Sequence, residues 1–209
     1  REENISKPTN YDWNKIHIRL TKNSLHNDLT NISNDDTRFK KLLKDDIWYP
    51  TKIESYEEKE ISDDALLLIT PSGKVVYKYY GYTNQQEWID ETISKCQWNT
   101  KRKWEIRLKP RPHVDAGLYK NKTIYEHLKG TSGVVTDISM TAIDSIVSGY
   151  PAFVHKDHVC SSIAETDYKN INNMKAPNKK DLKEWMWKVA NCQFTLEEFK
   201  SGEIYEYIK

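Results

Sequence analysis

Basic side chains at the end of an apolar stretch are the first residues of this sequence whose types and spacing suit chemistry. Arg107, Lys109 and Arg111 occupy alternate positions in "WEIRLKPRP", and prolines stop the run. Alternate residues of a strand point to one face, so the three cations share one face and one end. Such a cluster suits a bound phosphate. A solvated basic edge without a ligand is the alternative.

A second group of polar residues follows the apolar stretch "GVVT". Ser139 and Thr141 open the segment "SMTAIDSIVSG", and Asp144 lies further along it. A serine that caps a helix leaves hydroxyl and backbone N–H donors where anions bind. We expect Ser139 and Thr141 to contact a phosphate and Asp144 to accept hydrogen bonds from ribose hydroxyls. An ordinary helix cap with a solvated Asp144 is the alternative.

The turn "TPSG" adds a small polar loop after another apolar stretch. Ser72 and Gly73 lie in this turn, where a bound phosphate has room to approach the backbone. Turns of this composition are common, so the loop alone is a weak indicator of a site. We include both residues in the predicted phosphate site.

The sequence lacks the motifs of nucleoside triphosphatases, of ordinary dinucleotide dehydrogenases and of hydrolases with a nucleophile elbow. It contains no GxxxxGK[ST] loop, no GxGxxG fingerprint and no GxSxG elbow. "HKDHVC" brings His155, His158 and Cys160 together, but no second cluster of ligands accompanies them. We therefore expect no metal site.

The elements that must position these residues alternate between strands and helices. Apolar runs predict strands at "ALLLIT", "WEIRL", "GVVTDI" and "PAFVH". Helical spacing separates them, with capping boxes expected at Thr83 with Gln86 and at Thr123 with Glu126, and a cap at Ser139. This alternation predicts an α/β fold, a Rossmann-like parallel sheet with helices on both faces and further helices at the C-terminus.

The expected sheet places the polar groups at one edge. Ligands of parallel sheets bind beyond the carboxyl ends of the strands, where all three polar segments lie. Ile69, Leu108 and Val135 should lie on neighbouring buried strands. The stretch "VVYKYYGY" reads as a half-buried aromatic strand or hairpin.

The chain of 209 residues fits one domain with an appended segment. Residues 1–60 are polar and weakly periodic, so we expect a partly ordered N-terminal segment. Residues 61–209 form the expected Rossmann-like domain with C-terminal helices, the last of which begins with a capping box at Thr195 and Glu198.

Composition limits the partners. Lys plus Arg (32) nearly balances Asp plus Glu (31), so any anion recognition must be local. The 3 cysteines are odd in number and lack CxxC spacing, which predicts free thiols and a reducing cytoplasm. No apolar run is long enough for a membrane span, so we expect no membrane partner.

The order of strand, "RLKPRP", short helix and "GVVTDISMTAIDSIVSGYPAFV" resembles the donor-binding half of GT-B glycosyltransferases, especially capsule, sialyl and Kdo transferase-like groups. In those families a basic-proline strand end and a Ser/Thr-led helix followed by Gly-x-Pro hold the donor nucleotide. Residues 35–209 also look like uncharacterised tailed-phage proteins that end in a segment like "WMWKVANCQFTLEEFKSGEIYEYI". The chain departs from the pattern at Asp144, where Glu is common, and at Arg111, where His is common.

The resemblance implies a phage-encoded, metal-independent glycosyltransferase in the host cytoplasm. It implies a nucleotide sugar as donor substrate, no other cofactor, and an unknown acceptor, either a glycan or a modified DNA base. An inverting transfer needs a general base, for which Asp35, Asp36 and His113 are candidates. The chain has room for one of the two Rossmann-like domains of such enzymes. The alternative is a non-catalytic nucleotide- or DNA-associated binding module of a phage.

Overall fold

A four-stranded parallel sheet forms the centre of the molecule. The structure, a computed structural model, describes residues 17–19, 29, 32–44, 55–108 and 122–208. The sheet comprises β2 (Leu66–Ile69), β3 (Trp104–Ile106), β4 (Thr131–Val135) and β5 (Ala152–Phe153). Its strand order is β3-β2-β4-β5, and all neighbours are parallel. The predicted Rossmann-like α/β fold is therefore confirmed.

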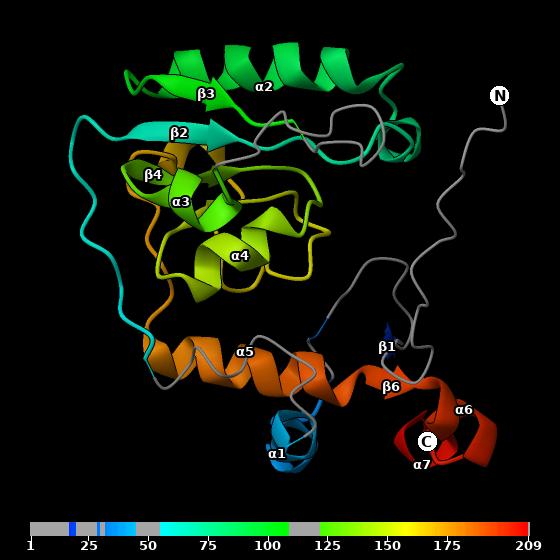
Figure 1. Ribbon diagram of the computed structural model, residues 1–209. Coiled ribbons are helices and arrows are strands. Elements are labelled where there is room, and N and C mark those ends of the chain that lie inside the picture. Colours follow the sequence, from blue (N-terminus) through cyan, green and yellow to red (C-terminus); the bar gives the residue numbers. More distant parts are fainter. Residues whose placement is uncertain (1–16, 20–28, 30–31, 45–54, 109–121, 209) are drawn as a thin grey trace, which may run out of the picture.

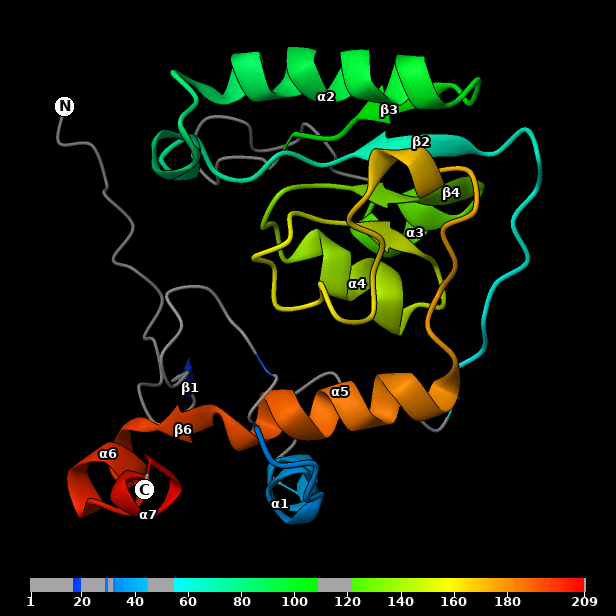
Figure 2. The same cartoon turned by 180° about the vertical axis from the view of Figure 1, so that it is seen from behind.

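Helices cover both faces of this sheet (Figures 1 and 2). On one face lie α2 (Gln85–Asn99) and the 3-10 helix η3 (Val76–Tyr80), and on the other lie α3 (Ile124–Leu128) and α4 (Thr141–Val147). The strand side chains alternate accordingly. Leu67 and Ile69 pack with the α2 side, whereas Leu68 packs against Leu128 of α3. Both faces of the sheet are thus buried, as continuous apolar strands require.

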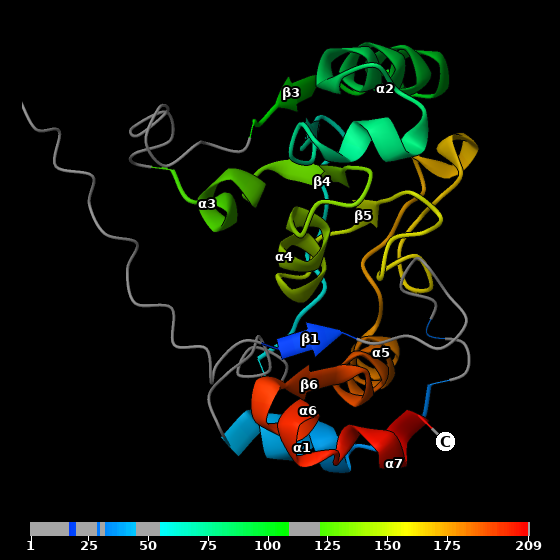
Figure 3. The same ribbon diagram turned by 90° about the vertical axis from the view of Figure 1, so that its right-hand side faces the viewer.

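A second layer lies below α4. It contains α5 (Lys179–Asn191), β6 (Gln193–Thr195), α6 (Leu196–Ser201) and α7 (Ile204–Ile208), with the short helix η4 (Tyr168–Asn170) leading into it from the α2 side of the sheet. The N-terminal helix α1 (Thr37–Lys44) packs on α5, and β1 (His17–Arg19) pairs antiparallel with β6 (Figure 3). One apolar core joins α1, α4 and α5. The described part of the N-terminal segment therefore belongs to the same folded body as the C-terminal helices.

A buried ion pair fastens α1 to α6. Both guanidinium NH groups of Arg38 donate to the Glu198 carboxylate, at 2.8 and 2.6 Å. Lys41 adds a third bond to the same carboxylate at 3.0 Å. Burial opposes the ionisation of Glu198, but these bonds and one from the Thr195 backbone outweigh burial and hold the pKa at about 2. The carboxylate is therefore charged at neutral pH.

The aromatic stretch at residues 75–82 differs from its prediction. It forms η3 rather than a strand or hairpin, and Gly81 ends the turn with a φ of 83°. A strand would bury alternate residues together. Here Tyr77 is fully buried while Tyr79 is 83% exposed, which suits one turn of helix.

The prediction for Leu108 is also wrong. β3 ends at Ile106, and Leu108 is 40% exposed beyond it. The last residue of β2, Ile69, is the register partner of Ile106, so Leu108 lies beyond the end of its partner strand. Ile69 and Val135 are buried register partners, as predicted.

The predicted helix caps are partly right. The capping boxes at Thr123 with Glu126 and at Thr195 with Glu198 are present. The cap of α2 is Asn84 rather than Thr83, and the Asn84 Oδ1 accepts a hydrogen bond from the Glu87 N–H. Asparagine and threonine both cap helices, so the two adjacent residues compete for this position. The cap of α4 is Met140 rather than Ser139, since the helix starts one residue later.

All 3 cysteines are free and buried, which confirms that prediction. Among the described residues, no helix has the length and apolar character needed to cross a membrane.

Candidate functional site

The strand order creates a crevice between the carboxyl ends of β2 and β4. From β2 the chain passes through α2 to β3 on one side, and then returns through α3 to β4 on the other side of β2. The connections leave β2 and β4 on opposite faces of the sheet, which opens a crevice between their ends. In open parallel sheets, ligands bind at this switch point.

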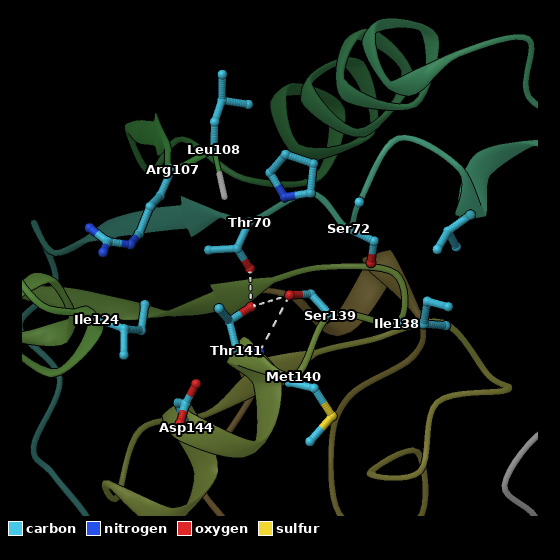
Figure 4. A pocket seen from close by; sticks show the side chains of 13 residues that line it. Thr70, Ser72, Arg107, Leu108, Ile124, Ile138, Ser139, Met140, Thr141 and Asp144 are labelled. Atoms are coloured by element: carbon cyan, nitrogen blue, oxygen red, sulfur yellow. Dashed lines mark hydrogen bonds between the residues drawn. The ribbon is translucent and has the colours of Figure 1, made fainter. Parts of the chain in front are cut away.

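The crevice holds a cavity of about 370 Å³ (Figure 4). It brings together predicted site residues from all three polar segments, namely Ser72, Gly73, Arg107, Ser139, Thr141 and Asp144. The loop after β2, the end of β3 and the start of α4 supply them. Lys109, Arg111 and His113 lie outside the described residues.

A chain of three hydroxyls crosses the middle of the cavity (Figure 4). Thr70 Oγ1 lies 2.6 Å from Thr141 Oγ1, which donates to Ser139 Oγ at 3.0 Å. The Thr141 hydroxyl has a single proton, so it accepts from Thr70 in turn. Ser139 Oγ also accepts from the Thr141 N–H, at 3.4 Å. Both lone pairs of Ser139 Oγ are then used, and its own O–H proton is the donor at the end of the chain.

Arg107 supplies positive charge at the cavity. Its backbone N–H continues the β2–β3 ladder by donating to Ile69 O at 2.9 Å. Its guanidinium bonds to His127 Nδ1 at 2.9 Å and to the Lys122 carbonyl at 3.1 Å. The guanidinium never deprotonates in proteins, so Arg107 brings a permanent positive charge to the cavity.

Asp144 supplies the negative charge. Its Oδ1 accepts a hydrogen bond from the Tyr125 hydroxyl at 3.1 Å. Burial, the charge of Asp144 and this bond raise the pKa of Tyr125 to about 12, so the phenol remains a donor at neutral pH. Asp144 is thus a carboxylate held in place beside the cavity.

The loop after β2 is bound to the loop after β4. The Ser72 hydroxyl donates to Asp137 Oδ1, and Gln85 donates to the Ser72 carbonyl at 2.6 Å. The side chain of Ser72 therefore holds the cavity wall together. A Cβ added at Gly73 meets no atom within 4 Å, so the fold itself does not require glycine there.

The candidate bases Asp35 and Asp36 are not brought to the cavity. They precede α1, which lies beyond α5 from the sheet (Figure 1). Asp35 accepts from the Thr37 side chain and backbone, which lowers its pKa, and Asp36 pairs with Lys40 at 2.9 Å. Both carboxylates serve the start of α1.

Sequence reasoning missed residues that shape the cavity. Thr70 belongs to the hydroxyl chain, and its signal was a polar residue at the end of "ALLLIT". Apolar walls come from Val76, Leu108, Ile124, Ile138 and Met140. No local pattern marked them, because they come from separate elements. Together they give the cavity a polar centre and an apolar surround.

His158 has a structural role near the cavity. Its Nδ1 accepts from the Cys160 N–H at 2.9 Å, and its Nε2 bonds to the Ser139 carbonyl at 3.1 Å. Both ring nitrogens are thus used to fix the loop that carries Ser139. Within the described ranges, no group of three or more His, Cys, Asp or Glu side chains is arranged to hold a metal ion.

No protein-family model matches the sequence, and no curated protein or solved structure is significantly similar to it.

Proposed function

We propose that the protein is a glycosyltransferase that binds a nucleotide sugar in the cavity between the ends of β2 and β4. One observation carries the proposal. Arg107, the Ser139 hydroxyl and Asp144 line a single cavity at the switch point of a parallel sheet. A cation and a hydroxyl donor suit the phosphate groups, and a carboxylate suits ribose hydroxyls.

The apolar surround fits the rest of such a ligand. Leu108 and Met140 are exposed beside the polar centre, and Ile138 lines the same cavity. A nucleobase presents flat apolar faces, which side chains of this kind cover. Ligand cavities of this type combine apolar walls with a few placed polar groups.

The proposed transfer requires positive groups next to the leaving phosphate. In the transfer, the bond between the sugar carbon and the phosphate oxygen breaks while the acceptor oxygen bonds to that carbon. Negative charge develops on the departing phosphate, where Arg107 and Ser139 stabilise it. The acceptor proton passes to a base, for which we propose His113, the candidate that lies outside the described residues. Asp144 is the one acidic residue among the described residues lining the cavity, and its proposed partner is the ribose.

A second candidate function is a non-catalytic nucleotide-binding module of a phage. The placement of Asp35 and Asp36 at the start of α1, away from the cavity, favours it. This module would bind the same nucleotides without transferring a sugar. Release of free sugar or nucleotide from the donor therefore separates the two candidates.

Calorimetric titration tests the shared binding step. Uridine, cytidine, guanosine and thymidine diphosphates and cytidine monophosphate are titrated into the full chain and into Arg107→Ala. Loss of a charge-assisted bond of about 1.5–3 kcal/mol should weaken binding at least about tenfold. Lys103→Ala, which removes an exposed charge just before β3, is the matched control and should bind normally. Failure of all five nucleotides at millimolar concentration would reject the proposal.

A further inference from the structure

The orientation of Arg107 depends on a histidine that does not line the cavity. Glu105 and Arg107 are two positions apart at the end of β3, so their side chains share one face of the strand. His127 of α3 lies against that face and bonds to both. Its side chain is 2% exposed, so water does not compete for either ring nitrogen.

The two bonds fix the protonation state of His127. Arg107 only donates hydrogen bonds, so Nδ1, at 2.9 Å from the guanidinium, is the acceptor and carries no proton. Nε2 lies 2.8 Å from Glu105 Oε1, which accepts when ionised, so Nε2 carries the proton. The imidazole is neutral, and the carboxylate selects its tautomer.

The same helix holds the other charged group of the cavity. Tyr125 and His127 are two residues apart on α3, so they point to nearly opposite sides of it, at about 200°. Tyr125 donates to Asp144 on α4, while His127 accepts from Arg107 beside β3. Figure 4 places Arg107 and Asp144 at the same side of the cavity, with Ile124 of α3 between them. One short helix thus contacts both charged groups.

We propose that His127 is a positioning residue, whose neutral imidazole holds the Arg107 guanidinium at the cavity for the anionic group of the ligand. This inference rests on the proposed function, because it concerns the same site. Glu105 acts one step further out, through the tautomer of His127. The Lys122 carbonyl holds the second guanidinium nitrogen, so the group is fixed at two points.

Two amide variants separate positioning from packing. His127→Asn places an amide oxygen near the position of Nδ1, where it still accepts from Arg107. His127→Gln places its amide near Nε2 and keeps the contact to Glu105 instead. With inorganic pyrophosphate as the probe, His127→Asn should bind within about threefold of the unmodified chain, and His127→Gln should bind about tenfold more weakly.

A double-mutant cycle assigns the difference to Arg107. In an Arg107→Ala background the two amide variants should bind equally, since the group that they position is absent. Equal affinities of the two variants in the unmodified background would overturn the proposal. Melting temperatures identify a variant that fails to fold.

Nitrogen NMR of the ligand-free full chain gives a readout that needs neither variants nor ligand. The imidazole of His127 should carry its proton on Nε2, with Nδ1 unprotonated. A proton on Nδ1 would overturn the arrangement even if pyrophosphate binds. If no phosphate ligand binds at all, the proposed function fails, and the tautomer still decides whether His127 holds Arg107.

Discussion

The polar groups of the cavity act as pairs in which a partner fixes each one. Tyr125 holds Asp144, and the Thr141 hydroxyl and N–H fix Ser139 Oγ. Thr70 and Thr141 donate their hydroxyl protons within the chain, whereas Ser139, the last donor, does not donate to another hydroxyl of the chain. The consequence is that a single hydroxyl should matter more than its neighbours.

Replacement of Ser139 by alanine should therefore weaken binding of a nucleoside diphosphate by about tenfold, the value of one hydrogen bond to a charged group. The side chain is only half-buried, so the melting temperature should change little. Ser148→Ala, at the other end of α4, is the matched control and should leave affinity unchanged. Calorimetric titration measures both, and equal affinities for the two variants would contradict the role of Ser139.

The ion pair of Arg38 and Glu198 predicts a loss of stability in acid. The pKa of Glu198 is about 2 in the folded chain and about 4.3 in an unfolded one, so the unfolded state binds a proton first as pH falls. The stabilisation is complete above about pH 5 and is lost as pH falls towards 2. Urea denaturation of the full chain at pH 7, 4 and 3 should show this decline.

Glu198→Gln should remove that pH dependence. It should also lower the free energy of unfolding at pH 7 by about 3–5 kcal/mol, because Arg38 would remain buried without its countercharge. Glu197→Gln, on the exposed side of α6, is the matched control. An unchanged decline in acid for Glu198→Gln would assign it to other carboxylates.

At the scale of elements, the sequence predicts the sheet because its signals are local. Apolar runs mark β2 and β4, and their polar ends carry Ser72 and Ser139, so the meeting of these residues follows from the fold class. Arg107 comes with them through the end of β3. The predictions that fail are those that depend on contacts with other elements. The exposure of Leu108 depends on where its partner strand β2 ends, and the role of His127 depends on side chains of β3 and the residue after it.

The predicted first residues of α2 and α4 are wrong by one position for a different reason. Adjacent residues such as Thr83 and Asn84 both have side chains that cap helices, so the pattern leaves the start uncertain by one residue. Asp35 and Asp36 show the remaining limit. Nothing in the sequence around them indicates that α1 packs on α5 rather than beside the sheet.

The turn after α4 gives a prediction about backbone conformation. Gly149 has a φ of +85°, and an added Cβ would collide with the carbonyl oxygen of Glu57. Gly149→Ala should therefore destabilise the chain by more than about 1 kcal/mol. Gly130 has a φ of +83° with no atom near an added Cβ, so Gly130→Ala isolates the cost of the backbone conformation. Urea denaturation should rank Gly149→Ala below Gly130→Ala, and equal stabilities would rule out the collision.

At the scale of the whole molecule, the cavity lies at the ends of the sheet strands, and the C-terminal layer packs against α4. The core that joins α1, α4 and α5 supports α4 from below, while the sheet presents the loops above it. The near-balance of 32 basic and 31 acidic residues means that no general field attracts anions. Recognition of a phosphate ligand then depends on local groups such as Arg107, which lines the cavity.

Binding of such a ligand should stabilise the whole chain. A ligand present at a hundred times its dissociation constant adds about 2.7 kcal/mol to the free energy of unfolding. For a chain of this length that corresponds to a rise in melting temperature of about 5–10 °C. A thermal-shift panel of nucleoside diphosphates and nucleotide sugars measures the rise and ranks the bases.

The double variant Lys109→Ala with Arg111→Ala tests whether the cations of "RLKPRP" contribute to that rise. Loss of two charge-assisted contacts should weaken binding by about a hundredfold or more, which removes most of the shift at the same ligand concentration. Lys101→Ala with Lys103→Ala removes the same charge before β3 and serves as the matched control. An equal shift in both double variants would mean that these two cations form a solvated edge, and that Arg107 and the hydroxyl chain bind the ligand without them.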